Sequence, residues 1–391
     1  MRIASRTVGE ASEYLRHVLW FVTESSYALH GAEPGVSDFC FGNQHEMPLP
    51  EIPRAIARWS EPQNKDWFAY RQSDPNAVRA VVKSLREHVG IEFDASDISM
   101  ATGAFGGLVS TLRALLDPGD EVIYLSPPWF FYVPLMISLG ATPVRVDFEA
   151  PDFRLPVDAI ERAITDRTRL IIVNSPHNPS GRIFDADELG RLGAVLGRAK
   201  QPLYLVSDES YSRILFDGRP FQSPLHFYDR SILIYTYGKT LLAPGQRLGY
   251  IALSPRMPDR AEVMRSVVTS QIMAWAFPNA VMQYALPDLE GVSIDIPALQ
   301  RRRDRMTAAL RGMGYETVVP EGTFYILVRS PIPDDVEFTE MLAGQRVFVM
   351  PGQVFELPGW FRISLTANDA MVDRSFEGFQ RARDAARAGK L

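Results

Sequence analysis

A series of short apolar runs, separated by helix-like stretches between about residues 95 and 255, constrains the fold of this chain most strongly. The runs are rich in β-branched residues, as the strands of a buried parallel sheet are, and the stretches between them are long enough for crossover helices. The pattern predicts an α/β fold whose mostly parallel sheet is sandwiched between helices. The runs are EVIYL from 121, TPVRVDF from 142, RLIIVNSP from 169, PLYLVSDE from 202 and SILIYTYG from 231.

The pattern changes near residue 286. The charged, helix-like segment IPALQRRRDRMTAALRGMGYE is followed by the strand-like runs TFYILVRS, RVFVMPG and WFRISLT, which predict a smaller α+β unit. A length of 391 residues also suits two domains. We expect an N-terminal arm of residues 1–45, a large α/β domain of residues 46–285 and a small α+β domain of residues 286–391.

Composition limits the classes of function. The chain has 41 Lys plus Arg against 47 Asp plus Glu and no basic tract, so we expect neither nucleic acid nor an anionic membrane as a partner. Cys40 is the only cysteine, and the six histidines never fall at i, i+4 spacing, so no metal site is expected. No export signal is readable, and the longest uncharged stretch, residues 122–144, is interrupted by prolines. We therefore expect a protein of a reducing compartment, the cytoplasm.

Polar side chains follow three of the apolar runs, and ligands of open α/β sheets bind outside the carboxyl ends of the strands. Asn178 follows the run from 169, and Asp208 and Tyr211 follow the run from 202. Thr236 and Lys239 follow the run from 231. Each residue alone is compatible with a structural role, such as a turn, a helix N-cap, a core aromatic or a solvated lysine. Together they predict an amide, a carboxylate, a phenol and an amine along one edge of the sheet.

Two glycine-containing segments are tested against nucleotide-binding motifs. GKT begins at Gly238 but lacks the glycine that a phosphate loop requires five residues earlier, where Leu233 stands, and this excludes the NTPase interpretation. GAFGG begins at Gly103 without the G-x-G-x-x-G spacing, which argues against a nicotinamide oxidoreductase. Gly103 still follows a strand-like run and opens a helix-like one, so the amides of Gly103 and Ala104 suit a phosphate.

The segment TYGKTLLAPGQRLGY, residues 236–250, resembles the lysine segment of the class I/II aminotransferases, the fold-type I family that uses pyridoxal 5'-phosphate (PLP). NSPHNPSG, SDESY, ATGAFGGL, DPGDEVI and PPWFFY are similar to other motifs of that family in the expected order, and FRISLT is similar to its arginine motif. The resemblance runs from about Gly42 to Arg362. It implies a fold-type I PLP enzyme that moves an amino group from an L-amino acid to a 2-oxo acid.

The resemblance also implies roles around the PLP ring. Lys239 forms a Schiff base with the aldehyde and shuttles a proton at the substrate α-carbon. Asp208 keeps the ring nitrogen protonated, and at about 4 Å and an effective dielectric near 20 such a pair is worth about 4 kcal/mol. Asn178 and Tyr211 resemble the pair that hydrogen-bonds the ring oxygen. Trp129 resembles the aromatic residue that stacks on the ring.

For the phosphate group, the resemblance implies binding by the backbone around Gly103, Ala104 and Phe105. Arg247 and Thr236 are the implied side-chain partners of the phosphate. The family commonly has a serine directly before the lysine, where this chain has Gly238. One phosphate-binding hydroxyl is therefore absent.

For the substrate, Arg362 matches the arginine that binds the α-carboxylate through a bidentate fork, and Gly42 and Asn178 complete the implied set. Tyr70, in DWFAYRQS, resembles the tyrosine that reaches the cofactor phosphate of the neighbouring subunit, which implies a homodimer with shared active sites. Asp74 and Pro75 follow where the family usually has a glycine. This departure concerns Tyr70 more than Lys239.

Two other functions remain to be weighed. A β-lyase of the same fold needs the same lysine and aspartate, so the motifs leave both reactions open. A ligand-sensing regulator of this fold carries a DNA-binding domain in front, but only about 40 residues precede the resemblance here, too few for a winged helix.

Substrate preference depends on Phe105, which stands where some dicarboxylate-specific relatives have a lysine. A distal cation lent by a partner subunit, from Arg71 or Lys65, is the alternative. We expect large neutral amino acids to be preferred over aspartate, because an apolar wall gains from burying apolar side chains and not from desolvating a second carboxylate. Two interpretations are open for Trp20, Phe21, Tyr27, Trp275 and Phe277: they build that wall, or they are simple core residues.

Overall fold

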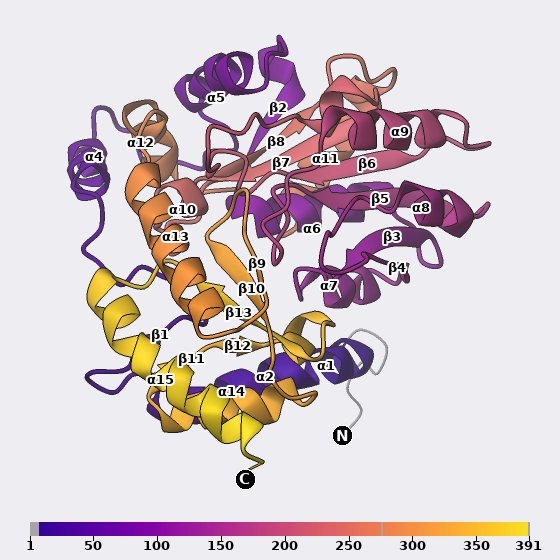
Figure 1. The fold of residues 1–391 in the computed structure, drawn as a ribbon. Helices are drawn as coiled ribbons and strands as arrows, with labels where there is room; N and C mark the ends of the chain where they lie inside the picture. Colours follow the sequence, from indigo (N-terminus) through magenta and orange to yellow (C-terminus); the bar gives the residue numbers. More distant parts are fainter. Residues whose placement is uncertain (1–7, 275–276, 390–391) are drawn as a thin grey trace, which may run out of the picture.

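The structure, a computed structural model, describes residues 8–274 and 277–389. Figure 1 shows a larger unit, in which helices flank a sheet, and a smaller unit formed mainly by the orange and yellow C-terminal part of the chain. The strands of the large sheet are β2 (Ile98–Ala101), β3 (Glu121–Ser126), β4 (Thr142–Asp147), β5 (Thr168–Asn174), β6 (Tyr204–Asp208), β7 (Ser231–Thr236) and β8 (Gly249–Leu253). Their order is β2-β8-β7-β6-β5-β3-β4, and β8 runs antiparallel to both neighbours. The mostly parallel sheet predicted from the sequence is confirmed.

Helices cover both faces of this sheet because successive strand residues point to opposite sides. In β7, Ile232 and Ile234 pack with α6, α7 and α11, whereas Leu233 and Tyr235 pack with α4, α5 and α12. Two further helices, α8 and α9, cover β3 and β5 on the second side. The helices are α4 (Glu51–Ser60), α5 (Pro75–His88), α6 (Gly103–Leu115), α7 (Tyr132–Ser138), α8 (Val157–Ala163), α9 (Ala186–Gly197), α11 (Arg260–Ala274) and α12 (Ala280–Leu289).

The smaller unit is α+β, as predicted. Its antiparallel sheet has the order β12-β13-β10-β9, and a parallel pair joins β1 to β11. Its core includes apolar side chains from β10, β13 and three helices. The elements are β1 (Ser37–Asp38), α13 (Ile296–Gly312), β9 (Thr317–Val318), β10 (Tyr325–Arg329), α14 (Asp335–Gly344), β11 (Val347–Phe348), β12 (Met350–Pro351), η4 (Gly352–Phe355), β13 (Trp360–Ser364) and α15 (Asp369–Arg387).

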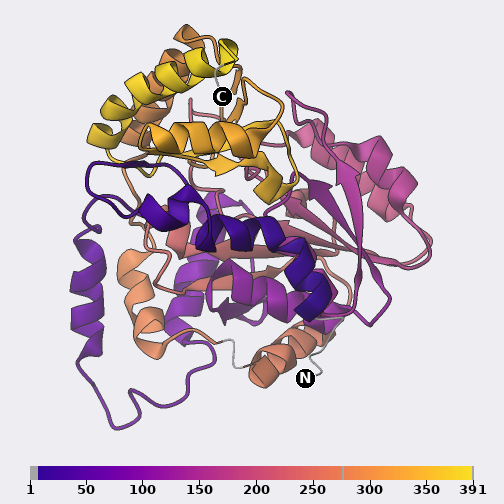
Figure 2. The same ribbon diagram turned by 90° about the horizontal axis from the view of Figure 1, so that it is seen from below.

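The N-terminal arm lies along the junction of the two units. It consists of α1 (Glu10–Tyr14), α2 (Arg16–Thr23) and α3 (Ser26–His30), which pack on α7, η4 and α14, respectively. Figure 2 shows the indigo helices of the arm between the yellow and orange helices and the purple and magenta part of the chain. The arm therefore contacts both units.

The domain boundaries expected from the sequence stay predictions. β1 falls within the residues expected as an arm, yet it pairs with β11 of the smaller unit. The expected boundary after residue 285 falls inside α12, which packs on α4 and α5 of the larger unit. In the parts of the chain that the structure describes, no helix is long and apolar enough to cross a membrane.

Candidate active site

The carboxyl ends of β5, β6 and β7 face a cavity of about 440 Å³. A larger hollow of about 840 Å³ lies between α4, α5 and α12 and has none of the predicted site residues in its wall. The smaller cavity collects nearly all of them. Its wall includes Gly42, Ala104, Phe105, Trp129, Asn178, Asp208, Tyr211, Thr236, Lys239, Arg247 and Arg362.

Strand register explains why residues far apart in the sequence meet here. Asn174 is the pairing partner of Asp208 at the ends of β5 and β6. The next strand, β7, ends at Thr236, whose hydroxyl caps the short helix α10 (Tyr237–Thr240) by accepting a hydrogen bond from the Gly238 N–H at 3.3 Å. The strand stops there and the helix turns Lys239 into the cavity. An amine and a carboxylate are thereby delivered by adjacent strands.

The carboxylate of Asp208 is buried and held on both oxygens. Tyr132 Oη donates to Oδ2 at 2.6 Å, while Ser210 donates to Oδ1 from its hydroxyl at 2.6 Å and from its N–H at 3.1 Å. Burial raises the pKa of Asp208, and the hydrogen bonds from Ser210 and Tyr132, with the charge of Lys239, oppose that rise. The helix N-cap alternative for Asp208 does not apply, because a turn follows β6.

Tyr132 was not among the predicted site residues. It stands three positions after Trp129 in the apolar run WFFY, where it resembles a core aromatic. In the structure it opens α7, and burial raises its pKa well above the usual value, which keeps the phenol protonated as a donor to Asp208. The sequence offered one signal for Tyr132 as a site residue: it is a tyrosine at the start of a helix that follows a strand of the sheet.

The loop after β5 fixes Asn178. Its backbone N–H donates to Asn174 Oδ1 at 2.8 Å, and Asn174 Nδ2 donates to the backbone oxygen of Asp208 at 2.9 Å. Asn178 Oδ1 accepts a hydrogen bond from Arg362 Nη1 at 3.0 Å. Two amide side chains, those of Asn174 and Asn178, therefore connect the strand ends to the arginine of the smaller unit.

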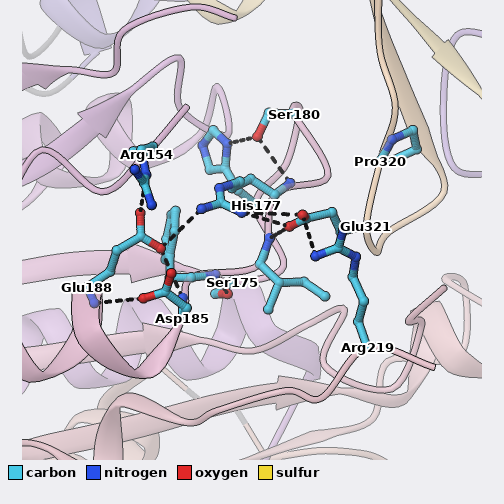
Figure 3. A network of polar contacts seen from close by, with 12 residues as sticks. Arg154, Ser175, His177, Ser180, Asp185, Glu188, Arg219, Pro320 and Glu321 are labelled. Atoms are coloured by element: carbon cyan, nitrogen blue, oxygen red, sulfur yellow. Dashed lines mark hydrogen bonds and ion pairs between the residues drawn. The ribbon is translucent and has the colours of Figure 1, made fainter. Parts of the chain in front are cut away.

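His177 fixes this loop by contacts with Ser180 and with the backbone of Pro127. Its Nδ1 lies 2.7 Å from Ser180 Oγ (Figure 3). Its Nε2 lies 3.0 Å from the backbone oxygen of Pro127. Because the carbonyl oxygen only accepts, Nε2 carries the proton and Nδ1 accepts from the serine hydroxyl. Burial lowers the pKa of His177 to about 3, so the ring is neutral at physiological pH.

A charged network ties the same loop to the smaller unit. Glu321 lies 2.8 Å from Arg219 and 3.2 Å from Arg182, which follows the loop (Figure 3). The backbone joins the two units here as well, because Glu321 N–H and Gly322 N–H both donate to Gly181 O, at 2.9 and 3.0 Å. The position of Asn178 is thus fixed by the large unit through His177 and by the smaller unit through Glu321 and Gly322.

Arg362 enters the cavity from β13 of the smaller unit. Its Nη2 donates to the backbone oxygen of Cys40 at 3.1 Å, and its Cζ lies 3.9 Å from the ring centroid of Tyr325. Among the described residues its buried Nε has no hydrogen-bond partner. The protein therefore orients the guanidinium through two of its five N–H groups, and the other three, that of Nε among them, remain for a ligand.

Tyr325 is a second residue that sequence reasoning missed. Leu327 pairs with Arg362 across β10 and β13, so Tyr325, two residues away on β10, lies on the same face as Arg362. Burial opposes ionisation of the Tyr325 phenol, but the charges of Arg362 and Lys239 outweigh it and lower the pKa. The strand register was needed to find this residue.

A corner suited to an anion lies at the start of α6. Gly103 has φ of +70°, and a Cβ there would lie 2.7 Å from Arg247 Nη2, so a glycine is required beside this guanidinium. The first backbone N–H groups of a helix lack partners within the helix and favour a negative charge. The Thr236 hydroxyl is close by, but besides capping α10 it donates to Leu248 O at 3.3 Å.

Tyr70 does not contribute to the cavity of its own chain. It is 89% exposed and lies on the loop after α4, which projects from the body of the protein (Figure 2). It lines a separate surface hollow together with Phe277. The role predicted for Tyr70 in a partner subunit stays a prediction.

The apolar wall of the cavity differs from the one expected. Leu15, Val18, Leu19 and Val22 line it from the arm, at the i, i+3, i+4, i+7 spacing of one helix face. Phe105 contributes from the large unit, and its ring meets the ring of Trp129 edge-on at 5.5 Å.

Of the two alternatives for Trp20, Phe21 and Tyr27, the structure supports the core, since none of them is in the cavity wall. Phe21 is buried and stacks on Tyr27 at 5.0 Å, and Trp20 packs against the same core cluster. Trp20 and Phe21 thus lie on the side of α2 that faces the protein interior, and Tyr27 belongs to α3. Trp275 lies outside the described residues, and Phe277 lines the hollow beside Tyr70.

Comparison with known proteins places this geometry in a family. The family model for "Aminotransferase class I and II" matches residues 35–379, so the chain belongs to that family. The aspartate/prephenate aminotransferase of Thermus thermophilus is 30% identical over 347 residues, covering 86% of this chain and 88% of the relative. The aspartate aminotransferase of Thermotoga maritima is 29% identical over 327 residues, covering 80% and 83%.

Solved structures agree with this assignment. An aminotransferase from Eubacterium rectale superposes with a TM-score of 0.86 at 26% identity, covering 98% of this chain and 96% of that one. Thermus thermophilus aspartate aminotransferase with maleate has a TM-score of 0.84 at 26% identity, covering 98% and 100%. The protein is thus an aminotransferase of fold-type I, a PLP-dependent family, and the predicted fold, family and reaction are confirmed.

The buried neutral His177 makes stability depend on pH. In the unfolded chain a histidine has a pKa of about 6.5, so below that pH the unfolded state binds a proton that the folded state, with a pKa of about 3, does not. The free energy of unfolding falls by up to about 1.4 kcal/mol per pH unit as pH drops below about 6.5. Denaturant unfolding between about pH 4 and 8 should show a weaker pH dependence in His177→Gln than in the wild type. Equal slopes would contradict the assignment.

Proposed function

We propose that the cavity binds PLP and that the residues around it carry out transamination between an L-amino acid and a 2-oxo acid. The observation that supports this most directly is the pair formed by Lys239 and the buried carboxylate of Asp208 in one cavity. Burial alone would favour the neutral acid, yet Tyr132 and Ser210 supply three donors to it. Such a carboxylate suits a cationic ring nitrogen.

The residues present fit the cofactor. The glycine at position 103 leaves the space that a side chain would fill beside Arg247, so an anion can approach both the guanidinium and the first amides of α6. Trp129 and Ala104 line the cavity next to this corner. PLP, when bound, supplies an electron sink that stabilises negative charge at the substrate α-carbon.

Lys239 is proposed to hold the aldehyde and to move the proton at the α-carbon. Its Nζ lies 5.7 Å from the ring centroids of both Tyr211 and Phe324, so the amine sits between an aromatic wall and the open cavity. An amine in reach of the α-carbon acts as general base and then as general acid. Tyr211 and Asn178 are proposed to hydrogen-bond the ring oxygen from the same side.

Arg362 is proposed to bind the α-carboxylate of the substrate. Asn178, Cys40 and the Tyr325 ring fix the plane of its guanidinium, and an oriented fork loses less entropy when it binds a carboxylate. Gly42 lies beside this group, where a Cβ would meet Phe324 at 2.6 Å. The substrate would therefore be held with its α-carbon toward Lys239.

A homodimer is proposed on the basis of the loop that carries Tyr70. Phe68 and Tyr70 are 64% and 89% exposed on this loop, an unusual exposure for aromatic rings. A second copy would bury them, and Tyr70 would then reach the phosphate corner of the partner. The cytoplasm is proposed as the compartment because Cys40, the only cysteine, is a free buried thiol, which suits a reducing environment.

Labelling tests the role of Lys239. The purified protein loaded with PLP should absorb visible light, and borohydride reduction followed by peptide mapping should place the pyridoxyl group on Lys239. Lys239→Ala should lose the label and retain the folded far-ultraviolet circular dichroism spectrum. Lys65→Ala, which removes an exposed lysine paired with Asp66, serves as the control and should keep the label. A label on another lysine would overturn the assignment.

Turnover tests the network around Asp208. Asp208→Asn should lower kcat by orders of magnitude, since each loss of about 1.4 kcal/mol in transition-state stabilisation is tenfold in rate. Tyr132→Phe removes one hydrogen bond to a charged acceptor and should lower kcat about tenfold with little change in KM. Single-turnover kinetics separate these effects from cofactor loss. A Tyr132→Phe protein that loses stability but keeps kcat would show that Tyr132 only packs.

Substrate preference follows from the cations of the cavity. Among the described residues that line it, the lysines and arginines are Lys239, Arg247 and Arg362, and each already has a role. The wall near α2 and Phe105 is apolar. Burying an apolar donor side chain there gains about 25 cal/mol per Å², whereas a second carboxylate would be desolvated without a counterion.

A panel of amino donors tests this preference. Phenylalanine, leucine or methionine should give a higher kcat/KM than aspartate, although the relatives named above act on aspartate by name. Phe105→Lys should raise kcat/KM for aspartate relative to leucine. The proposal fails if aspartate exceeds every neutral donor tenfold in the wild type, since a distal cation would then exist.

A further inference from the structure

A carboxylate outside the active site joins the arm, the large unit and the small unit. Glu356, directly after η4, accepts hydrogen bonds from Tyr14 of α1, from Tyr124 Oη at 3.2 Å and from Ser126 Oγ at 2.8 Å, the last two on β3. Arg145 Nη1 of β4 lies 3.2 Å from the same carboxylate. The Glu356 side chain is only 14% exposed. Three parts of the chain thus converge on one side chain.

The backbone of Glu356 is unusual for its residue type. It has φ of 60° and ψ of 26°, the left-handed region in which a side chain costs free energy and glycine does not. A residue persists in such a conformation when the surrounding structure over-determines it. The contacts of the Glu356 carboxylate with the arm and the sheet hold the residue in this left-handed conformation.

The groups held by Glu356 continue directly into the cavity wall. Tyr14 ends α1, and the next residue, Leu15, begins the apolar stripe of the arm that lines the cavity. Ser126 ends β3 on the path to Trp129. Leu15 and Phe105 also line a neighbouring hollow together, so the start of the stripe and Phe105 form one apolar part of the wall, which suits a long donor side chain.

We propose that Glu356 is a positioning residue for substrate binding. Its carboxylate holds α1 against β3 and β4, so that Leu15 and the rest of the stripe on α2 close the cavity over the side chain of the donor. The inference rests on the proposed function, because it places the donor side chain against α2. Glu356 touches neither substrate nor cofactor and acts through the arm.

Kinetics of two variants test the proposal. Glu356→Gly removes the carboxylate and suits the left-handed backbone, so it should fold, and Tyr14→Phe removes a single donor. Both should raise KM for leucine or phenylalanine, about tenfold for Glu356→Gly, with kcat changed less than about twofold. KM for alanine, whose side chain is too short to reach α2, should stay unchanged. Burial raises the pKa of Glu356 to about 7, so assays are run near pH 8, where the carboxylate is charged.

The matched control is Glu33→Gln. Glu33 also connects the region of the arm to the small unit, through Arg346 at 3.2 Å, but it is exposed and lies outside the cavity wall. This variant should leave both KM values unchanged. An equal rise of KM for alanine and leucine in Glu356→Gly, or no rise in either variant, overturns the proposal.

Hydrogen exchange gives a readout that needs no turnover. Backbone amides of residues 10–23 should exchange faster in Glu356→Gly than in the wild type, and at the wild-type rate in Glu33→Gln. If the wild type transaminates no donor, the proposed function fails, while the exchange rates still decide whether Glu356 holds the arm. Unchanged exchange in Glu356→Gly overturns the positioning role.

Discussion

Asp208 places a carboxylate at the end of a buried strand, and much of the site is arranged around it. Removal from water raises the pKa of this group, so the hydrogen bonds from Tyr132 and Ser210 and the charge of Lys239 are what favour the ionised form. Tyr132 comes from a helix on one face of the sheet, Ser210 from the turn after β6, and Lys239 from the end of the next strand. The order of the strands and the placement of the helices thus bring together the groups that stabilise the Asp208 carboxylate.

Two sets of contacts, one at Glu321 and one at Glu356, join the two units, and they differ in kind. Each set is called a joint below. At Glu321 the joint includes backbone hydrogen bonds to Gly181, which depend on no particular side chain. At Glu356 it is made by hydroxyl groups and a guanidinium around one carboxylate. Both joints constrain the sequence: the first requires a glycine, because Gly181 has φ of +75° and a Cβ there would lie 2.2 Å from Pro320 Cβ, and the second requires the carboxylate.

The sequence predicted the fold and most of the site because the relevant residues stand at strand ends. Lys239, Asp208 and Asn178 are each placed by the strand directly before them, so local pattern was sufficient. Tyr325 could not be found in this way, because its position beside Arg362 depends on how β10 and β13 pair. The sequence left open which arm residues line the cavity, because α2 lies between a core and the cavity and is apolar on both sides, so periodicity does not distinguish the two sides.

The antiparallel direction of β8 has a topological consequence for the corner at the start of α6 that is suited to an anion. Gly249, the first residue of β8, pairs with Thr236 at the end of β7 and with Ala101 at the end of β2. A parallel strand at this position would have required the chain to cross to the opposite edge of the sheet after Lys239 before returning. Because β8 runs backwards, the connection stays at the ligand-binding edge and carries Arg247 to the start of α6. A single reversal of chain direction thus brings both Lys239 and Arg247 to the cavity in one short connection.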